Sequence, residues 1–193
     1  MLDENSNKKA EAVAGQEVCP GQGVVRAVCI SEKKGVEKHS VPEGHFLVNF
    51  GIEGDAHAGN WHRQVSLLSY DKVEAFNQRG ANVEDGAFGE NLVVAGLDFR
   101  SMPVGTRLYA GTVELEMTQI GKECHSHCAI YKRMGECIMP REGVFAKVLK
   151  EGVIRPGDVM RAEPPAADRP FTAAVITLSD KGARGERKDE SGP

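Results

Sequence analysis

Short segments with strand-like hydrophobic patterns follow one another along most of the chain. The clearest covers residues 112–119, where Val113, Leu115 and Met117 alternate with polar side chains, as in a strand that buries one face. Runs rich in β-branched and other apolar residues predict further strands at 24–30, 45–50, 63–68, 91–95, 105–109 and 157–161. The pattern therefore predicts a mostly β protein.

Helical periodicity is confined to a few short segments. Residues 70–79 carry Val73 and Phe76 at helical spacing, and Gly80 supplies a stop. Residues 122–134 and 144–149 have mixed or helical patterns. The 22 glycines and 9 prolines among 193 residues also favour short elements separated by turns. The fold class that we expect is a closed or folded-over β-barrel with a few short helices.

One main domain with additional segments at both ends is expected from the length and the local composition. We predict a flexible N-terminal segment at residues 1–22 and a main domain at residues 23–163. A proline-rich and alanine-rich stretch predicts a linker at residues 164–171. A separate piece, residues 172–193, begins with an apolar strand pattern and continues as a polar, turn-rich sequence.

Composition and charge narrow the class of protein. With 40% apolar and 27% charged residues, the chain resembles an ordinary globular protein. Its 24 basic and 28 acidic side chains give a formal charge of -4, which argues against nucleic acid or an anionic membrane as a partner. The sequence shows no signal peptide and no membrane-spanning run, so a cytoplasmic location is expected. Five cysteines, an odd number, favour reduced thiols or metal ligands over disulfides.

The densest cluster of reactive side chains is KECHSHC, residues 122–128. If a helix begins here, Cys124 and Cys128 share one face, and nearby cations and the helix N-terminus lower the pKa of a thiol. The cluster thus indicates a reactive or metal-binding cysteine, whereas the alternative is a pair of small buried thiols. A structural zinc site is a further alternative, although such sites usually pair two ligand motifs and the second is missing here.

Two glycine-containing stretches are further candidates for a site. In GIEGDAHAGNWHRQ, residues 51–64, three glycines permit close backbone approach, and Asp55, His57 and Arg63 are among its polar groups. This stretch is either a ligand-contacting loop or an ordinary strand connection. In GAFGENL, residues 86–92, Glu90 and Asn91 precede a strand, and this stretch by itself indicates only a loop.

Taken together, these segments resemble the MOSC domain, which also forms the C-terminal part of molybdenum cofactor sulfurases. The resemblance spans roughly residues 23–163 and rests on five stretches: GIEGDAHAGNWHRQVSLLS, GAFGENLVVAGLDF, VGTRLYAGTVELEMTQIGKECHSHC, MPREGVFAKVL and RPGDVM. It implies a MOSC-type β-barrel. It also implies a cysteine late in the domain that ligates the molybdenum of the pyranopterin cofactor or carries sulfur.

The resemblance assigns that role to Cys124, which follows the strand TVELEMTQ, with Cys128 as the neighbouring alternative. A thiolate is a soft ligand that suits such a metal centre. The candidate residues for binding the anionic phosphate of the pterin are His57, Arg63 and Lys122. Asn91 is the candidate for a hydrogen bond to the pterin. The cofactor implied is therefore molybdenum cofactor, or molybdopterin.

The end of the chain carries a second resemblance. Residues 173–193, AAVITLSDKGARGERKDESGP, resemble the opening of a molybdopterin adenylyltransferase domain, including Ser179 and Asp180. A complete domain of that kind needs on the order of 100 residues, so no adenylyltransferase activity is expected from this piece.

Three functions remain in view from the sequence. The first is binding of the cofactor, or carrying of its sulfur, in cofactor metabolism or delivery, with cofactor biosynthesis or acceptor proteins as partners. The second is molybdenum-dependent reduction of N-hydroxylated compounds, which needs an external reductase because no iron–sulfur or flavin motif is present. The third is a structural zinc module.

Overall fold

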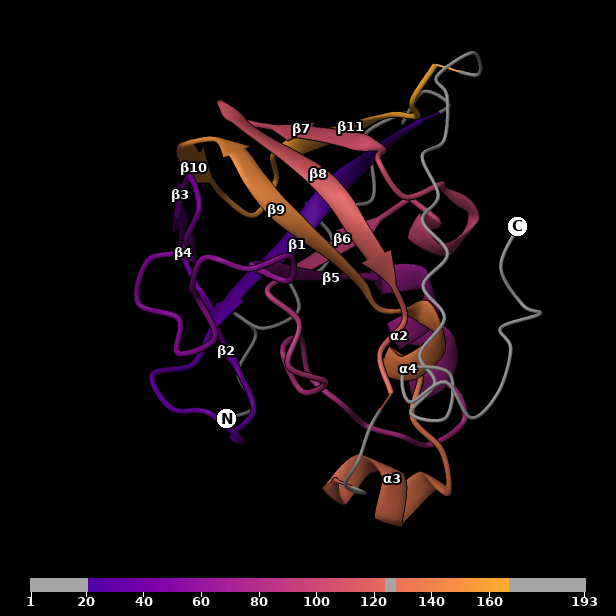
Figure 1. Cartoon of the computed structure of the whole chain (residues 1–193). Helices are drawn as coiled ribbons and strands as arrows, with labels where there is room; N and C mark the ends of the chain where they lie inside the picture. The colour runs from indigo at the N-terminus through magenta and orange to yellow at the C-terminus, as the bar shows by residue number, and fades with distance from the viewer. Residues whose placement is uncertain (1–20, 124–127, 167–193) are drawn as a thin grey trace, which may run out of the picture.

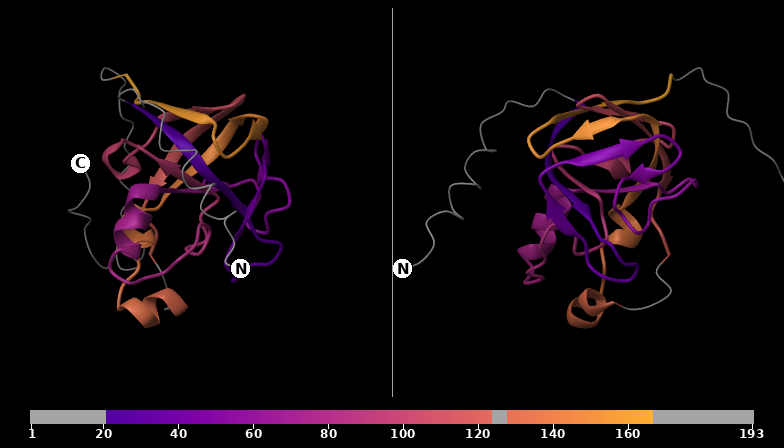
Figure 2. Two further views of the ribbon diagram at one scale, coloured as in Figure 1. Left: turned by 180° about the vertical axis from the view of Figure 1, so that it is seen from behind. Right: turned by 90° about the vertical axis from the view of Figure 1, so that its left-hand side faces the viewer.

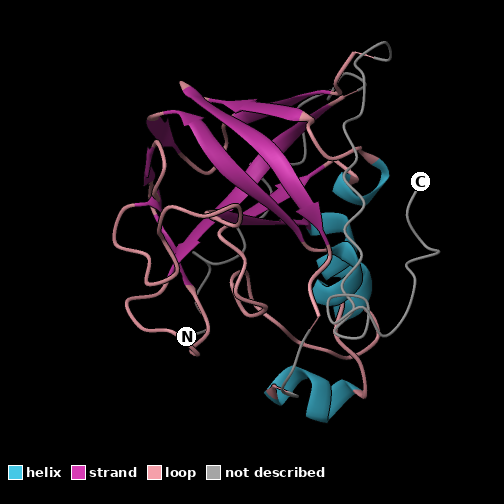
Figure 3. Cartoon of the chain, in the orientation of Figure 1, coloured by secondary structure: helices cyan, strands magenta, loops and turns pink. Residues whose placement is uncertain are grey.

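Strands make up most of the ordered framework (Figures 1 and 3). The computed structural model describes residues 21–123 and 128–166. Its strands are β1 (Gln22–Ile30), β2 (His39–Val41), β3 (Gly44–Leu47), β4 (Gly51–Ile52), β5 (Val65–Ser69), β6 (Leu92–Ala95), β7 (Arg107–Ala110), β8 (Val113–Ile120), β9 (Val144–Lys150), β10 (Gly152–Ile154) and β11 (Val159–Glu163). Its helices are α2 (Tyr70–Asn77), α3 (Ala129–Met134), α4 (Met139–Glu142) and the 3-10 helix η1 (Phe99–Ser101).

The main sheet closes on itself to form a barrel. Strands β11, β7, β8, β9, β5, β6 and β1 are neighbours in that order, and β1 pairs again with β11. All of these pairings are antiparallel except that of β5 with β6, whose connection contains α2. Strand β2 extends the sheet beyond β1, and β10, β3 and β4 form a small second sheet. The predicted mostly β barrel with a few short helices is confirmed.

Alternation along β8 shows how the sequence builds the barrel wall. Val113, Leu115 and Met117 are buried in the main core, as their period of two predicts. The outward-facing Glu114 and Glu116 between them form ion pairs with side chains of the two flanking strands. The strand is therefore apolar on the inner face and charged on the outer face.

A second apolar cluster lies outside the barrel and anchors the helices. Val73 and Phe76 of α2 pack in this cluster with Leu68 of β5, and Ile130 of α3 and Ile138 join them. The helices α2, α3 and α4 gather towards one end of the barrel, as the views in Figures 1 and 2 show. This end also carries long loops, so it provides room for a site.

Two predicted elements differ in the structure. The segment 144–149, given a mixed or helical pattern above, is strand β9, because β5 and β8 supply hydrogen-bonding neighbours on both sides. The strand predicted at 45–50 ends at Leu47, and the chain then turns. Gly51 follows this turn with a φ of +114°, and a Cβ there would lie 2.6 Å from the Gln64 carbonyl oxygen. Such close backbone contact requires glycine.

The helix considered at residues 122–134 is also shorter than that pattern suggested. Among the described residues of this segment, Ala129–Met134 is helical, Cys128 is its N-cap residue, and Lys122 lies outside any helix. Cys128 has an extended backbone in place of the helical one considered for it, and Cys124 lies outside the described residues.

The predicted segments at the chain ends lie largely outside the described residues. These include most of the N-terminal segment and the piece that resembles an adenylyltransferase domain, so these domain boundaries stay predictions. Across residues 21–123 and 128–166, no helix combines the length and the apolar character needed to cross a membrane.

Replacement of Leu115 tests the barrel core. Leu115 is 1% exposed on β8, whereas Ile120 on the same strand is 37% exposed. We expect Leu115→Ala to lower the free energy of unfolding by about 2–5 kcal/mol, because it removes buried contacts and leaves a cavity. Ile120→Ala, the matched control, should cost much less in the same urea denaturation measurement. Equal losses for the two variants would contradict this assignment of the core.

Candidate functional site

A cavity of about 500 Å³ opens at the end of the barrel where the loops and helices gather. Its walls come from the loop after β1, the β4–β5 loop, the loop before β6, and the segment around α3 and α4. The four residues predicted to bind a cofactor all line it: His57, Arg63, Asn91 and Lys122. The structure thus brings together side chains from distant parts of the sequence.

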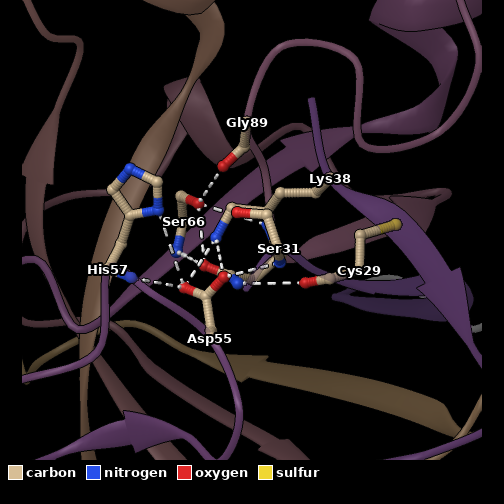
Figure 4. A network of polar contacts seen from close by, with 8 residues as sticks. Cys29, Ser31, Lys38, Asp55, His57, Ser66 and Gly89 are labelled. Carbon is tan, nitrogen blue, oxygen red and sulfur yellow. Dashed lines mark hydrogen bonds and ion pairs between the residues drawn. The ribbon is translucent and has the colours of Figure 1, made fainter. Parts of the chain in front are cut away.

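A buried ion pair between Lys38 and Asp55 lies beside this cavity (Figure 4). The Lys38 ammonium donates to both carboxylate oxygens of Asp55, at 2.8 and 2.7 Å, and each side chain is 1% exposed. The backbone amide of Ser31 donates to Asp55 Oδ1 at 3.0 Å, and that of His57 to Oδ2 at 3.3 Å. These hydrogen bonds and the ion pair replace the hydration that the two charged groups lose when they are buried.

The pair also sets the protonation state of Asp55. Burial raises the pKa of this carboxyl group, but the hydrogen bonds and charge of Lys38 outweigh that effect, so the pKa lies below its ordinary value. Asp55 is therefore a fixed carboxylate at neutral pH.

Asn91 connects three segments through its amide and backbone. Its side-chain nitrogen donates to the Cys29 carbonyl at 3.0 Å and also to Asp55. Its side-chain oxygen accepts from the Ser66 amide at 3.1 Å, and the Ser66 hydroxyl donates to the Gly89 carbonyl at 3.0 Å. Asn91 is only 2% exposed. Its hydrogen-bonding groups are thus engaged within the protein, and its predicted bond to a pterin remains untested.

The loop at residues 86–91, which the sequence marked only as a loop, is held rigidly against this network. Glu90 is fully buried and accepts from the Gly86 and Phe88 amides at 2.8 and 3.0 Å. The Lys38 amide donates to the Gly86 carbonyl at 3.1 Å. Gly86 has a φ of +96°, and a Cβ there would lie 2.4 Å from the Lys38 carbonyl oxygen. Only glycine allows this approach.

His57 lies at the edge of the network with its ring on the cavity. Its Nδ1 is 4.0 Å from Asp55 Oδ2, and the side chain is 39% exposed. Burial and the nearby Lys38 charge lower the pKa of His57. The ring is therefore neutral at pH 7 and presents one N–H donor and one acceptor.

Arg63 is the cation whose environment points most directly to an anionic ligand. Its guanidinium lies 4.7 Å from the centre of the Trp61 ring and 5.6 Å from that of Phe145. Its Nε is buried without a hydrogen-bond partner among the described residues. Two aromatic rings thus hold the guanidinium of this half-buried arginine on the cavity wall. Lys122, an exposed lysine, adds a second positive charge to the lining.

The cysteines fall into distinct environments. Cys29 is fully buried, and burial raises the pKa of its thiol to about 12, so it is an inert core residue. Cys128 is exposed, Cys137 is half-buried, and both line the cavity. Cys124, the predicted ligand, lies outside the described residues. Over the described part of the chain, no group of three or more His, Cys, Asp or Glu side chains is arranged to hold a metal ion.

Sequence reasoning missed three residues of the site. Lys38 stands among several lysines in a polar stretch, where a solvated charge is the usual outcome. Trp61 belongs to the loop that was singled out, but its contact with Arg63 is not visible in the sequence. Cys137 lies nine residues beyond Cys128, and only the turn after α3 returns it to the cavity.

Comparisons with known proteins identify one family by sequence and several solved structures with a similar fold. The sequence profile of the MOSC domain matches residues 54–161. None of the proteins of curated function matches the chain. The fold is similar to the crystal structure of the YuaD protein from Bacillus subtilis, with a TM-score of 0.63 and 17% identity over 75% of this chain and 97% of that one.

Two further solved structures share the fold. YiiM from Geobacillus stearothermophilus has a TM-score of 0.53 and 18% identity, and the match covers 76% of this chain and 75% of that one. YiiM from Escherichia coli has a TM-score of 0.52 and 19% identity, and the match covers 77% and 73% of the two chains.

Removal of one partner tests the buried ion pair. We expect Asp55→Asn to lower the free energy of unfolding by about 3–5 kcal/mol, because it leaves the Lys38 ammonium buried without a counter-charge. The matched control is Glu43→Gln, which removes an exposed partner of Arg155 and should leave the melting temperature nearly unchanged. A small loss for Asp55→Asn would show that the pair does not hold the site together.

The same pair predicts a pH dependence. Because the folded-state pKa of Asp55 is lowered, its stabilising contribution is complete above the unfolded value of about 3.9 and is lost as pH falls through the folded value. The difference in unfolding free energy between wild type and Asp55→Asn should therefore be constant near neutrality and shrink below about pH 4. Urea titrations at several pH values measure this, and a difference that grows on acidification would contradict it.

Proposed function

Because the chain belongs to the MOSC domain family, we propose that it binds the molybdenum cofactor in this cavity, or carries sulfur for it, through a cysteine thiolate. The observation that carries the proposal is the buried, unpartnered Nε of Arg63 on the cavity wall. A buried N–H donor without an acceptor is costly unless a ligand supplies one, and an anion is the acceptor that a guanidinium binds best.

The polar groups around the cavity fit the phosphate of a pterin cofactor. Arg63 offers a planar pair of donors for two phosphate oxygens, and Lys122 offers a point charge on the same cavity. His57, neutral at pH 7, offers one N–H without adding a charge. Together these side chains bind and orient an anion.

The thiols around the cavity fit a soft metal centre or a sulfur atom. When bound, the cofactor supplies a molybdenum ion that exchanges oxygen, sulfur or electrons with a substrate. Cys124 is the proposed ligand, and Cys128, which lines the cavity, is the alternative.

The buried network supplies the rigid wall for this site. Asn91 ties β1, β5 and the 86–91 loop together, so we assign it a positioning role in place of a direct bond to the pterin. The Lys38–Asp55 pair holds the backbone of His57 in the same way. Such fixed supports keep the donors at their positions before a ligand arrives.

The proposed partners are proteins that make the cofactor or accept it. This proposal is based on the sequence, which shows no iron–sulfur or flavin motif with which the chain would supply its own electrons. Delivery of a cofactor or of its sulfur needs no such group.

Replacement of Arg63 tests the anion site. Arg63→Ala should weaken cofactor retention about 10- to 100-fold, because charge-assisted hydrogen bonds contribute about 1.5–3 kcal/mol. Arg161→Ala is the matched control, since Arg161 also covers an aromatic ring, Tyr109, at 4.6 Å but does not line the cavity. Molybdenum and oxidised pterin are measured per folded protein made in a cofactor-competent host. Equal retention in the two variants would reject the anion site.

Replacement of the cysteines tests the thiolate. Cys124→Ser should abolish molybdenum retention or persulfide formation while the protein stays folded, because a serine hydroxyl remains protonated and is a poorer ligand. Cys29→Ser is the control for substitution of a buried thiol. Loss of metal in Cys128→Ser alone would transfer the role to Cys128. Bound zinc without pterin in wild type would favour a structural zinc module instead.

A further inference from the structure

Among the described residues, one tryptophan and two phenylalanines line the cavity, and they differ in exposure. Phe145 is 6% exposed and lies near the guanidinium of Arg63. Phe88 is half-buried, and its ring packs against that of Phe76 at 5.7 Å. Trp61, in contrast, is 42% exposed. Trp61 is therefore the aromatic side chain of this lining with the most surface available to a ligand.

The backbone around Trp61 is fixed although its side chain is exposed. The Gly59 amide donates to the Phe50 carbonyl at 2.6 Å, and the Trp61 amide donates to the Gly59 carbonyl at 3.0 Å. On the other side of Trp61, His62 Nε2 lies 3.0 Å from Gln119 Oε1 of β8. These bonds hold the loop before a ligand arrives, so little conformational entropy is lost when a ligand contacts the ring.

The guanidinium of Arg63 and the ring of Trp61 lie against each other on the cavity wall. The guanidinium carbon is over the ring, 4.7 Å from its centre, and the buried Nε has no hydrogen-bond partner among the described residues. An anionic group that binds to Arg63 is therefore close to Trp61 as well. The remainder of such a ligand can then contact an aromatic surface instead of water.

The ring system of the proposed cofactor has no binding group among the residues assigned so far. Asn91, the partner predicted for it from the sequence, is 2% exposed and uses its amide within the protein. Arg63 and Lys122 are assigned to the phosphate. A planar heteroaromatic ring stacks on an aromatic side chain, and such stacking depends little on the identity of the ring atoms. Trp61 meets this requirement.

We infer that Trp61 and Arg63 form a two-part recognition site, in which Trp61 stacks on the pterin ring and Arg63 binds the phosphate of the same molecule. This inference rests on the proposed function and deepens it. It assigns the ring to Trp61 in place of Asn91, and it makes the combination of a planar ring and an anion the feature that the cavity selects.

Phe50 offers a comparison for the exposed ring of Trp61. It is 40% exposed and lies at the start of the same β3–β4–β5 connection, yet it does not line the cavity. A contact surface for another protein would use both aromatic side chains, whereas a ligand in the cavity would use Trp61. Phe50 is therefore the matched control.

The experiment separates the two parts of the site with three probes. Full-length protein from a host that lacks the cofactor is titrated by calorimetry with 6-hydroxymethylpterin monophosphate, with 6-hydroxymethylpterin, and with glycerol phosphate. Wild type should bind the first probe most tightly. Trp61→Leu should weaken binding of the two pterins about 5- to 100-fold, the range for loss of one stacked ring, and should affect glycerol phosphate less. Arg63→Ala should weaken the two phosphate-bearing probes more than the phosphate-free pterin.

Two controls and a second readout accompany the titrations. Phe50→Leu should bind all three probes as wild type does, and Trp61→Phe, which keeps a ring, should retain most of the pterin affinity. Melting temperatures verify that the variants are folded. Trp61 is the single tryptophan of the sequence, so its fluorescence reports on this position directly. Bound pterin monophosphate should reduce the quenching of that fluorescence by acrylamide, because the stacked ring covers the indole.

Three results would overturn the inference. One is equal affinity of wild type for pterin monophosphate and glycerol phosphate. Another is an equal loss of pterin affinity in Trp61→Leu and Phe50→Leu, or no loss in either. The third is tighter binding of adenosine monophosphate than of pterin monophosphate, which would assign the ring site to a nucleotide.

Failure of this inference is distinguishable from failure of the proposed function. Molybdenum and oxidised pterin are measured per folded protein on the same variants made in a cofactor-competent host. If retention depends on Arg63 but is the same in Trp61→Leu as in Phe50→Leu, the stacking role alone is rejected. If wild type retains no cofactor and binds neither pterin probe, the proposed function is rejected as well.

Discussion

The buried ion pair between Lys38 and Asp55 is the interaction on which the arrangement of the cavity depends. It joins the loop after β1 to the β4–β5 loop, and neither segment has an extended hydrogen-bonded ladder of its own at that point. Two charges removed from water are stable only if each remains fully paired. The two loops that carry Lys38 and Asp55 can therefore adopt only backbone positions that keep the ion pair intact. Because both loops line the cavity, the pair also fixes the position of the cavity walls.

Around this pair, hydrogen bonds between buried polar groups fix the conformation of the loops, whereas apolar packing fixes the strands of the barrel. Asn91 and Glu90 together bind the backbone of three segments, β1, β5 and the 86–91 loop, so loops that bury little apolar surface still keep one conformation. The contrast with Arg63 is informative. The buried carboxylates of the network have their donors, whereas the buried Nε of Arg63 has no partner within the described chain. His57 Nδ1, on the same cavity, is also buried without a hydrogen-bond partner within the described chain. These two unmatched groups mark the face of the cavity that we propose for a ligand.

The barrel was predictable from the sequence where local pattern and final environment agree, as in β8, whose alternating residues occupy its two faces. Strand β9 was not, because its strand state comes from neighbours that lie far away in the sequence. The resemblance to the MOSC domain selected His57, Arg63, Asn91 and Lys122, all of which line the cavity. It gave no reason to select Lys38 or Cys137, since a single lysine or cysteine carries no periodicity, and their roles arise only when the chain folds back.

The closure of the barrel by β1 and β11 has a consequence for how the protein folds. Gln22 pairs with Arg161 and Val24 with Val159, so the ring is completed by strands from opposite ends of the domain. Contacts between such distant residues form slowly, because a long loop must be closed before they contribute any stability. During synthesis, residues 22–24 of β1 must wait without their β11 partners until β11 has left the ribosome. The N-terminal part of the β1 edge is thus open longest to pairing with another molecule.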